Sequence, residues 1–210
     1  MSDEHVIATH HGPTYQGSGK KLGELQYFVR LAGCSITQCP IRSRCDERLA
    51  LQRSNGSRLS TQDLLDHALD AVGEEGYLHI TGGEPMDQRD QVFNLVYRAH
   101  ERGLRVHLQT SGAIAVGMPI DWLTVSPKVP ISDLAQISGH ELIVVYDNQP
   151  LQELKELEME TDFTWHFLQP YWGEDGPMNS QETVKAVDEL NASGNKWRLT
   201  LQAHKYWGIR

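Results

Sequence analysis

The chain has 210 residues, of which 39% are hydrophobic, and its 28 acidic and 19 basic residues give a net charge of −9. A chain of this length encloses one core, so a single domain is expected over residues 1–210. The negative charge argues against bulk binding of nucleic acid, and every apolar run is far shorter than a membrane span. We therefore expect a cytoplasmic protein whose partners include neither nucleic acid nor a membrane.

Short apolar strands alternate with amphipathic helices along the chain, and no element is expected before residue 27. Strands are predicted at 27–32, 77–80, 105–108, 122–125, 142–146, 163–168 and 197–202. Helices are predicted from Ser60 to the glycine at 73, and at 91–102, 151–159 and 181–190. Such alternation indicates an α/β fold with a parallel sheet and right-handed crossovers.

Polar residues and glycines follow the predicted strands at their carboxyl ends. They are Gly33-Cys34, Thr81-Gly82-Gly83-Glu84-Pro85, Thr110-Ser111-Gly112, Ser126-Pro127-Lys128, Gln169-Pro170 and His204. In a parallel sheet these ends share one edge, which is where ligands bind in barrels and in doubly wound sheets. The sequence therefore predicts one ligand site at this edge.

Cys34, Cys39 and Cys45 are close enough in sequence for one loop to surround a metal or a cluster. Three thiolates leave one coordination position open, which favours an iron–sulfur cluster whose remaining iron binds a small molecule. Structural zinc would need a fourth ligand, and the next histidine is His67, inside a predicted helix. Zinc and unrelated free thiols remain the alternatives.

Several other residues near this edge have a plausible ligand role and a plain structural one. Gly83 allows close approach of backbone to a ligand, and Glu84 can accept hydrogen bonds from an amino group, although a simple turn would look the same. Tyr171 and Trp172 offer flat surfaces suited to a purine, or else pack against the protein. His204 follows the last predicted strand and has a structural role as its alternative.

Segments spread over most of the chain form a pattern when they are read together. They are Pro13-Thr14-Tyr15-Gln16-Gly17-Ser18-Gly19, Phe28-Val29-Arg30-Leu31-Ala32-Gly33-Cys34, Cys45-Asp46, Thr81-Gly82-Gly83-Glu84-Pro85, Ser126-Pro127-Lys128, Gln169-Pro170 and Trp197-Arg198-Leu199-Thr200-Leu201-Gln202-Ala203-His204-Lys205. This pattern resembles the 7-carboxy-7-deazaguanine synthases, a family of radical S-adenosylmethionine (SAM) enzymes. The cysteines and the Gly-Gly-Glu-Pro turn occur in radical SAM enzymes generally, whereas the segments around Gln16 and His204 are specific to the family.

The resemblance implies an incomplete (β/α) barrel of the radical SAM type, with a shortened core of six to seven mostly parallel strands. It implies a homodimer that contracts 6-carboxy-5,6,7,8-tetrahydropterin to 7-carboxy-7-deazaguanine with loss of ammonia, in deazapurine biosynthesis. The cofactors would be SAM, Mg2+ and a 4Fe-4S cluster on Cys34, Cys39 and Cys45. An external electron donor of the flavodoxin or ferredoxin type would be a partner.

The resemblance also assigns ligand-binding residues. Those expected to contact SAM are Gly83, Glu84, Ser126, Pro127, Lys128, Gln169, Pro170, Tyr171 and Trp172. Those expected to contact the pterin are Tyr15, Gln16, Gly17, Arg30, Thr81, His204 and the terminal carboxylate of Arg210. Arg30 is suited to this role because a guanidinium pairs with a carboxylate through two hydrogen bonds.

Three positions depart from the family pattern. The cysteine spacing is longer, Ser18 replaces a glutamate on the substrate side, and Glu47 replaces a threonine that contacts magnesium. Because Asp46 lies beside it, Glu47 is expected to hold Mg2+ directly, or else to pair with an arginine such as Arg44 or Arg48. A diverged radical SAM enzyme for another small heterocycle and a non-catalytic zinc module are the alternative functions.

Overall fold

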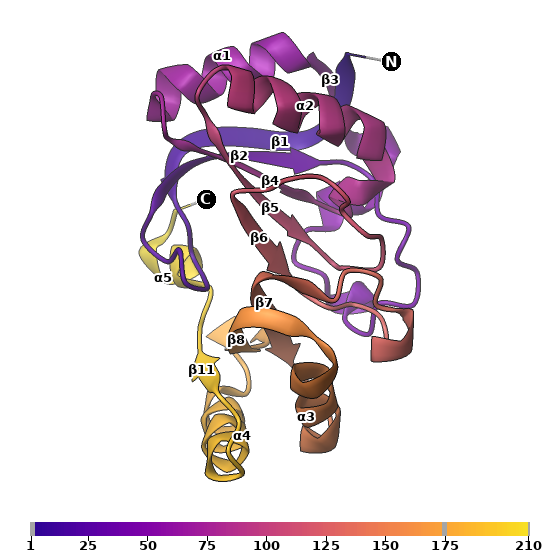
Figure 1. The fold of residues 1–210 in the computed structure, drawn as a ribbon, viewed down its shortest axis with the longest axis vertical. Helices are drawn as coiled ribbons and strands as arrows, with labels where there is room; N and C mark the ends of the chain where they lie inside the picture. The colour runs from indigo at the N-terminus through magenta and orange to yellow at the C-terminus, as the bar shows by residue number, and fades with distance from the viewer. Residues whose placement is uncertain (1–2, 174–175, 210) are drawn as a thin grey trace.

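The computed structural model describes residues 3–173 and 176–209, and its centre is a nine-stranded sheet (Figure 1). The strands of this sheet are β1 (Glu4–Tyr15), β2 (Leu25–Leu31), β3 (Ser57–Ser60), β4 (Tyr77–Gly82), β5 (Arg105–Thr110), β6 (Trp122–Val125), β7 (Ser138–Tyr146), β8 (Asp162–Pro170) and β11 (Trp197–Leu199). The helices are α1 (Thr61–Val72), α2 (Arg89–Glu101), α3 (Leu151–Glu160), α4 (Ser180–Ala192) and α5 (Ala203–Trp207). A small hairpin of β9 (Trp172–Gly173) and β10 (Gly176–Pro177) follows β8.

The strand order is β11-β8-β7-β6-β5-β4-β2-β1-β3. From β2 to β11 all neighbouring strands are parallel, whereas β1 pairs antiparallel with β2 and β3. The sheet is open because β11 and β3 lie at opposite edges. An incomplete barrel of mostly parallel strands, as expected from the sequence, is confirmed.

The expectation that no element precedes residue 27 is wrong, since β1 occupies Glu4–Tyr15. The reason is its composition: this strand carries polar side chains, and each is stabilised by its own contact with a neighbouring residue. The His10 ring stacks on His67 at a centroid distance of 5.3 Å, and its Nδ1 lies 2.6 Å from the hydroxyl of Tyr27. The His11 ring stacks on Phe28. Such a strand has no apolar run for a sequence pattern to detect.

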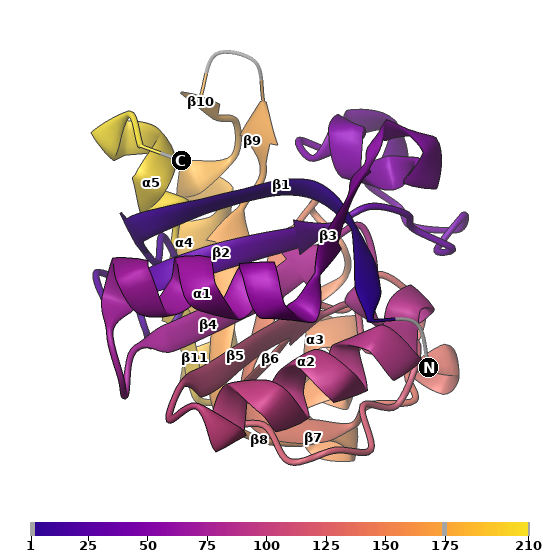
Figure 2. The same ribbon diagram turned by 90° about the horizontal axis from the view of Figure 1, so that it is seen from above.

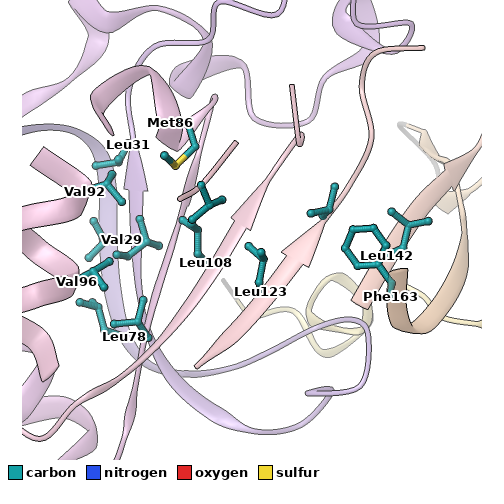
Figure 3. Close-up of a cluster of buried hydrophobic side chains, with 14 of the residues drawn as sticks. Val29, Leu31, Leu78, Met86, Val92, Val96, Leu108, Leu123, Leu142 and Phe163 are labelled. Atoms are coloured by element: carbon teal, nitrogen blue, oxygen red, sulfur yellow. The ribbon is translucent and has the colours of Figure 1, made fainter. Parts of the chain in front are cut away.

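Helices α1 and α2 cover the sheet around β1 to β5, and α3 and α4 cover it near β8 and β11 (Figure 1). Their apolar stripes lie against one face of the sheet, where alternate strand residues such as Val29, Leu78, Leu108, Leu123 and Leu142 are buried (Figure 3). Burying each such side chain contributes about 1.5–3 kcal/mol. This packing fixes the strands and therefore the positions at which their carboxyl ends stop.

Helix α1 shows how local sequence sets these boundaries. The backbone N–H of Asp63 donates to Ser60 Oγ at 3.1 Å, which satisfies one of the free N–H groups at the helix start. The chain leaves the helix at Gly73, whose φ of 69° lies in the region that glycine adopts without strain. Leu64, Leu65 and the alanine at 68 face the core in between. The predicted start and end of this helix are confirmed.

The other face of the sheet carries a layer of buried polar groups. Gln26 Oε1 accepts from Nδ1 of His79 at 2.8 Å and lies 3.1 Å from Nδ1 of His107. Thr124 Oγ1 lies 2.8 Å from Nε2 of His107 and donates to Glu141 Oε1 at 2.6 Å. Burial lowers the pKa of His107 to about 3, so this ring is neutral at physiological pH.

The 16–24 loop, which joins β1 to β2, covers this polar face. Lys20 Nζ lies 4.5 Å from the ring centre of Trp165, and Lys21 Nζ lies 4.4 Å from that of Tyr77. The backbone N–H of Lys20 donates to Glu141 Oε2 at 2.7 Å. Cation–π contacts and a buried carboxylate therefore hold the loop against the hollow of the open sheet. Among the described residues, no helix has the length and apolarity needed to cross a membrane.

Candidate active site

A cavity opens at the carboxyl ends of the parallel strands. Of the residues that the sequence assigned to the site, it is lined by Tyr15, Gln16, Gly17, Arg30, Cys34, Cys39, Cys45, Glu47, Thr81, Gly83, Ser126, Lys128, Gln169 and His204. Glu84, Pro127, Pro170, Tyr171 and Trp172 do not line it, and Arg210 lies outside the described residues. The structure thus brings most of the predicted cofactor and substrate residues around one space.

The three cysteines lie on the 32–56 loop, which joins β2 to β3 and projects beyond the sheet (Figure 2). All three are free thiols that are partly exposed to the cavity. Arg42 Nη1 donates to the carbonyl of Ile36 at 3.0 Å and so braces the loop from inside. Burial raises the pKa of the Cys34 and Cys45 thiols, which keeps them protonated until a cation replaces the proton.

A single metal ion and an iron–sulfur cluster place different demands on the three thiols. Over residues 3–173 and 176–209, no three histidine, cysteine, aspartate or glutamate side chains lie close enough to hold one metal ion. A tetrahedral zinc ion requires sulfurs about 2.3 Å from one centre, whereas in an iron–sulfur cluster each thiolate binds a different iron. The three free thiols line one cavity, as binding of a different iron by each would require.

Lys128 is a cation in the lining of the cavity. Its Nζ donates to Ser126 Oγ at 2.6 Å and to the carbonyl of Ser126 at 3.2 Å. Desolvation lowers the pKa of this ammonium, while the neighbouring thiols Cys39 and Cys45 and the carboxylate of Asp46 act in the opposite direction. A carboxylate or sulfur anion bound here would gain an unpaired positive partner.

Glu84 is almost completely buried, with 1% of its surface exposed, and its oxygens are used within the protein. Oε1 accepts from the backbone N–H of Met86 at 2.9 Å and from the Thr110 hydroxyl at 2.6 Å. Oε2 accepts from the backbone N–H of Ser111 at 2.9 Å and from the Ser111 hydroxyl. Glu84 therefore ties the turn after β4 to the turn after β5, and both turns face the cavity.

The acidic residues after Cys45 are paired with cations. Arg30 Nη2 lies 3.0 Å from Glu47 Oε1, and Lys205 Nζ lies 2.5 Å from Asp46 Oδ2. Gln202 Nε2 also donates to Asp46 Oδ2, at 3.0 Å. Partial desolvation raises the pKa of Glu47 against the lowering effect of Arg30. The arginine that pairs with Glu47 is thus Arg30, and not Arg44 or Arg48 as the sequence suggested.

The 16–24 loop contributes the wall opposite the cysteines. Gln16 Oε1 accepts from the backbone N–H of Gly17 at 2.8 Å, whereas Gln16 Nε2 is buried without a hydrogen-bond partner in the described structure. A Cβ atom on Gly17 would lie 2.0 Å from His204 Nδ1, so only glycine allows this approach. Desolvation lowers the pKa of His204, which keeps its ring neutral at pH 7.

Tyr171 and Trp172 surround a second, outer hollow that shares Arg30, Cys45 and the acids at 46 and 47 with the main cavity. The Arg44 guanidinium lies 4.6 Å from the ring centre of Tyr171, and Trp172 meets Tyr206 edge to face. Tyr206 and Trp207, in helix α5, are 57% and 49% exposed. Helix α5 turns its aromatic side chains outward.

Some lining residues were missed by sequence reasoning. His11 and Phe28 come from β1 and β2, Gln109 from β5, and Gln202 from the turn before α5. For Gln109 a signal was present: position 109 continues the period-two series of polar residues at 105 and 107, which alternate with apolar residues at 106 and 108. In a strand with one polar face, the last residue of that face reaches the carboxyl edge.

Comparison with known proteins places this geometry in context. The 7-carboxy-7-deazaguanine synthase of Burkholderia multivorans is 34% identical over 210 residues, covering 93% of this chain and 95% of its own. The synthase of Caulobacter vibrioides is 31% identical with the same coverage. The crystal structure of QueE from Escherichia coli matches with a TM-score of 0.68 at 22% identity, over 96% of this chain and 95% of that chain. No protein-family model matches the chain.

An open, mostly parallel sheet with a three-cysteine loop at its carboxyl edge defines a fold of the radical SAM type. The similarity to curated relatives extends over nearly the whole chain. The chain belongs to the 7-carboxy-7-deazaguanine synthase family.

Proposed function

We propose that the protein converts 6-carboxy-5,6,7,8-tetrahydropterin to 7-carboxy-7-deazaguanine with loss of ammonia. The observation that carries this proposal is the convergence on one cavity of three free cysteines, Arg30 and Gln16, whose buried Nε2 has no hydrogen-bond partner among the described residues. The cysteines suit the cofactor, while Arg30 and Gln16 suit the substrate. The names of the relatives support the same reaction.

Cys34, Cys39 and Cys45 would hold a 4Fe-4S cluster, which when bound supplies the electron that cleaves SAM into methionine and a 5′-deoxyadenosyl radical. Three protein thiolates leave one iron available to the amino and carboxylate groups of SAM. On the protein side, Lys128 offers an ammonium, and Gly83 lines the same cavity. These groups orient the cofactor at the cysteine end of the cavity.

The substrate end is formed by the 16–24 loop and β2. The Arg30 guanidinium is the partner for the substrate carboxylate, and it must be shared with or released by Glu47. Gln16 Nε2 offers a donor to the carbonyl oxygen of the pterin, because an unpaired buried amide gains a full hydrogen bond from a ligand. His204, kept neutral by desolvation, offers one nitrogen as a donor or an acceptor.

Mg2+ at Glu47 is part of the same proposal. Oε1 of Glu47 is engaged by Arg30, so the cation competes with that guanidinium for the carboxylate. A substrate carboxylate that takes Arg30 releases Glu47 at the same time. Metal and substrate would therefore bind more tightly together than separately.

The working enzyme is proposed to be a homodimer that takes electrons from a flavodoxin or ferredoxin. Three free cysteines suit a reducing compartment such as the cytoplasm. The protein's part would be to hold one C–H bond of the substrate in place and to keep other hydrogen donors away. The lining of the cavity by short, well-anchored turns supports such positioning.

The test is anaerobic reconstitution followed by incubation with the tetrahydropterin, SAM and dithionite. We expect about four irons per chain, formation of 7-carboxy-7-deazaguanine, and loss of both iron and SAM cleavage in Cys39→Ala. SAM cleavage without turnover of the pterin would favour a diverged relative that uses another heterocycle. A colourless protein containing zinc would contradict the proposal and favour a metal-binding module.

A further inference from the structure

The segment that joins β11 to α5 is bonded to the substrate end of the cavity. The backbone N–H of Gly19 donates to Thr200 Oγ1 at 2.8 Å. The backbone N–H of Ala203 donates to the carbonyl of Gly17, also at 2.8 Å. Both partners belong to the 16–24 loop, which forms the wall opposite the cysteines. The end of the chain therefore helps to set the position of this loop.

The same segment is bonded to the 32–56 loop, which carries the cysteines. Lys205 Nζ lies 2.5 Å from Asp46 Oδ2, and Gln202 Nε2 donates to the same oxygen at 3.0 Å. Lys205 Nζ also donates to Gln202 Oε1 at 3.1 Å, which closes a ring of three side chains. Asp46 directly follows Cys45, so this ring is fastened beside one of the three thiols.

Lys205 lies behind the wall of the cavity. It lines neither the main cavity nor the outer hollow, whereas Asp46 and Gln202, its two hydrogen-bond partners, both line the main cavity. Its ammonium lies 5.2 Å from the ring centre of Trp172, and its side chain is 20% exposed. Lys205 is thus placed to act on a ligand through its neighbours.

Two contacts suffice to connect the cysteines with the substrate end. The first is the ion pair between Asp46, the neighbour of Cys45, and Lys205. The second lies one residue earlier, at His204, whose Nδ1 would be 2.0 Å from a Cβ atom on Gly17. A displacement of the 32–56 loop therefore reaches the wall of the substrate end through short contacts and covalent bonds.

We propose that Lys205 is a positioning residue that couples ligation of the three cysteines to the affinity of the substrate end. The inference rests on the proposed function, which supplies the cluster and the pterin. A loop whose cysteines are ligated has fewer conformations, so Asp46 is held in place before the pterin arrives. The pterin then causes a smaller loss of conformational entropy when it binds, and its affinity rises.

The test compares cluster-free and reconstituted protein, with the full chain in both cases and without SAM. Calorimetry gives the Kd for the tetrahydropterin. Mass spectrometry gives the hydrogen exchange of the peptide that contains the Ala203 N–H, in the absence of any ligand, and iron analysis shows that all variants are equally loaded.

Three variants separate the ion pair from other effects. Lys205→Met removes the charge and keeps the length of the side chain, whereas Lys205→Arg keeps the charge. Arg102→Met is the matched control, because it removes a partly exposed ion pair with Asp66, 2.6 Å long, in the layer of α1 and α2 (Figure 1).

We expect reconstitution to lower the Kd of the wild type for the pterin by at least about fivefold. It should also slow exchange at Ala203. In Lys205→Met both effects should shrink to less than about twofold, while Lys205→Arg and Arg102→Met should behave like the wild type. A residue that only stabilises the fold would change the affinity equally in the two forms of the protein.

Three results would overturn the coupling. One is a wild type whose Kd and exchange are the same with and without the cluster, and another is a Lys205→Met protein that keeps the full difference between the two forms. The third is an equal loss of pterin affinity in both forms of Lys205→Met, which would make Lys205 a direct ligand or a purely structural residue. A wild type that binds no pterin in either form would contradict the proposed function, and exchange at Ala203 would still decide whether the ion pair transmits ligation.

Discussion

Replacing Glu84 with glutamine should lower the free energy of unfolding of the protein, because the side chain holds the fold together and is not expected to bind a ligand directly. The carboxylate accepts four hydrogen bonds in a site with 1% exposure, two from Thr110 and Met86 and two from Ser111. Glutamine has only one acceptor oxygen. Its amide N–H2 would replace the other oxygen and face the two donors that this oxygen had accepted from. At about 1.5–3 kcal/mol for each bond to a charged group, loss of the pair costs about 3–6 kcal/mol.

Calorimetry or urea unfolding checks this value. For a chain of this size, each kcal/mol lowers Tm by about 2–4 °C, so Glu84→Gln should lower it by at least about 6 °C. Glu153→Gln, which changes an exposed residue of α3, should stay within about 0.5 kcal/mol of wild type. A Glu84→Gln protein as stable as wild type but unable to bind SAM would refute the scaffold role and make Glu84 a direct cofactor ligand.

Three further changes test the substrate side and the pH response. Gly17→Ala should raise the KM for the pterin up to about 100-fold and leave SAM binding nearly intact. The new Cβ would lie 2.0 Å from His204 Nδ1 and would push the His204 ring aside. Equal effects on both ligands would contradict this. Activity should require Mg2+ and fall in Glu47→Ala; full activity after dialysis against Mg2+-free buffer would mean that Glu47 only pairs with Arg30. Burial lowers the pKa of His5 from 6.5 to about 4, so the free energy of unfolding should fall as the pH drops through this range, and His5→Gln should flatten that dependence in unfolding measured by urea. A pH profile identical in the variant would show that His5 is not among the groups responsible.

The parallel part of the fold could be predicted because its strands are apolar on one face and end at glycines and polar turns. The strand predicted at 122–125 has the same boundaries in the structure, because non-strand segments border Trp122 and Val125. β1 could not be predicted, because its histidines are stabilised by residues far away in sequence, such as His67 and Tyr27. Such support depends on tertiary contacts that no local pattern contains.

The candidate site was predictable where residues act through position on a strand, and less so where they act through pairing. Arg30 lies on β2 and reaches the cavity as the alternation requires, but its ion pair with Glu47 joins two segments whose relative placement the sequence does not reveal. Glu84 illustrates the same limit. Its place in the turn was evident, whereas the donors that surround it come from the turn after β5.

The 16–24 loop, which lies against the polar face of the open sheet, affects which positions of the site can be substituted without changing the strands. In a closed barrel, inward-facing side chains belong to strands, so altering the interior puts ladder hydrogen bonds at risk. Here much of the interior surface near Gln16 and Gly17 belongs to the 16–24 loop, which is fastened at a few points such as Lys20 and Glu141. Ser18 belongs to this loop and to no strand, so its exchange removes no hydrogen bond between strands. A change of side chain at this position would therefore alter the wall of the cavity and leave the pairing of the strands as it is.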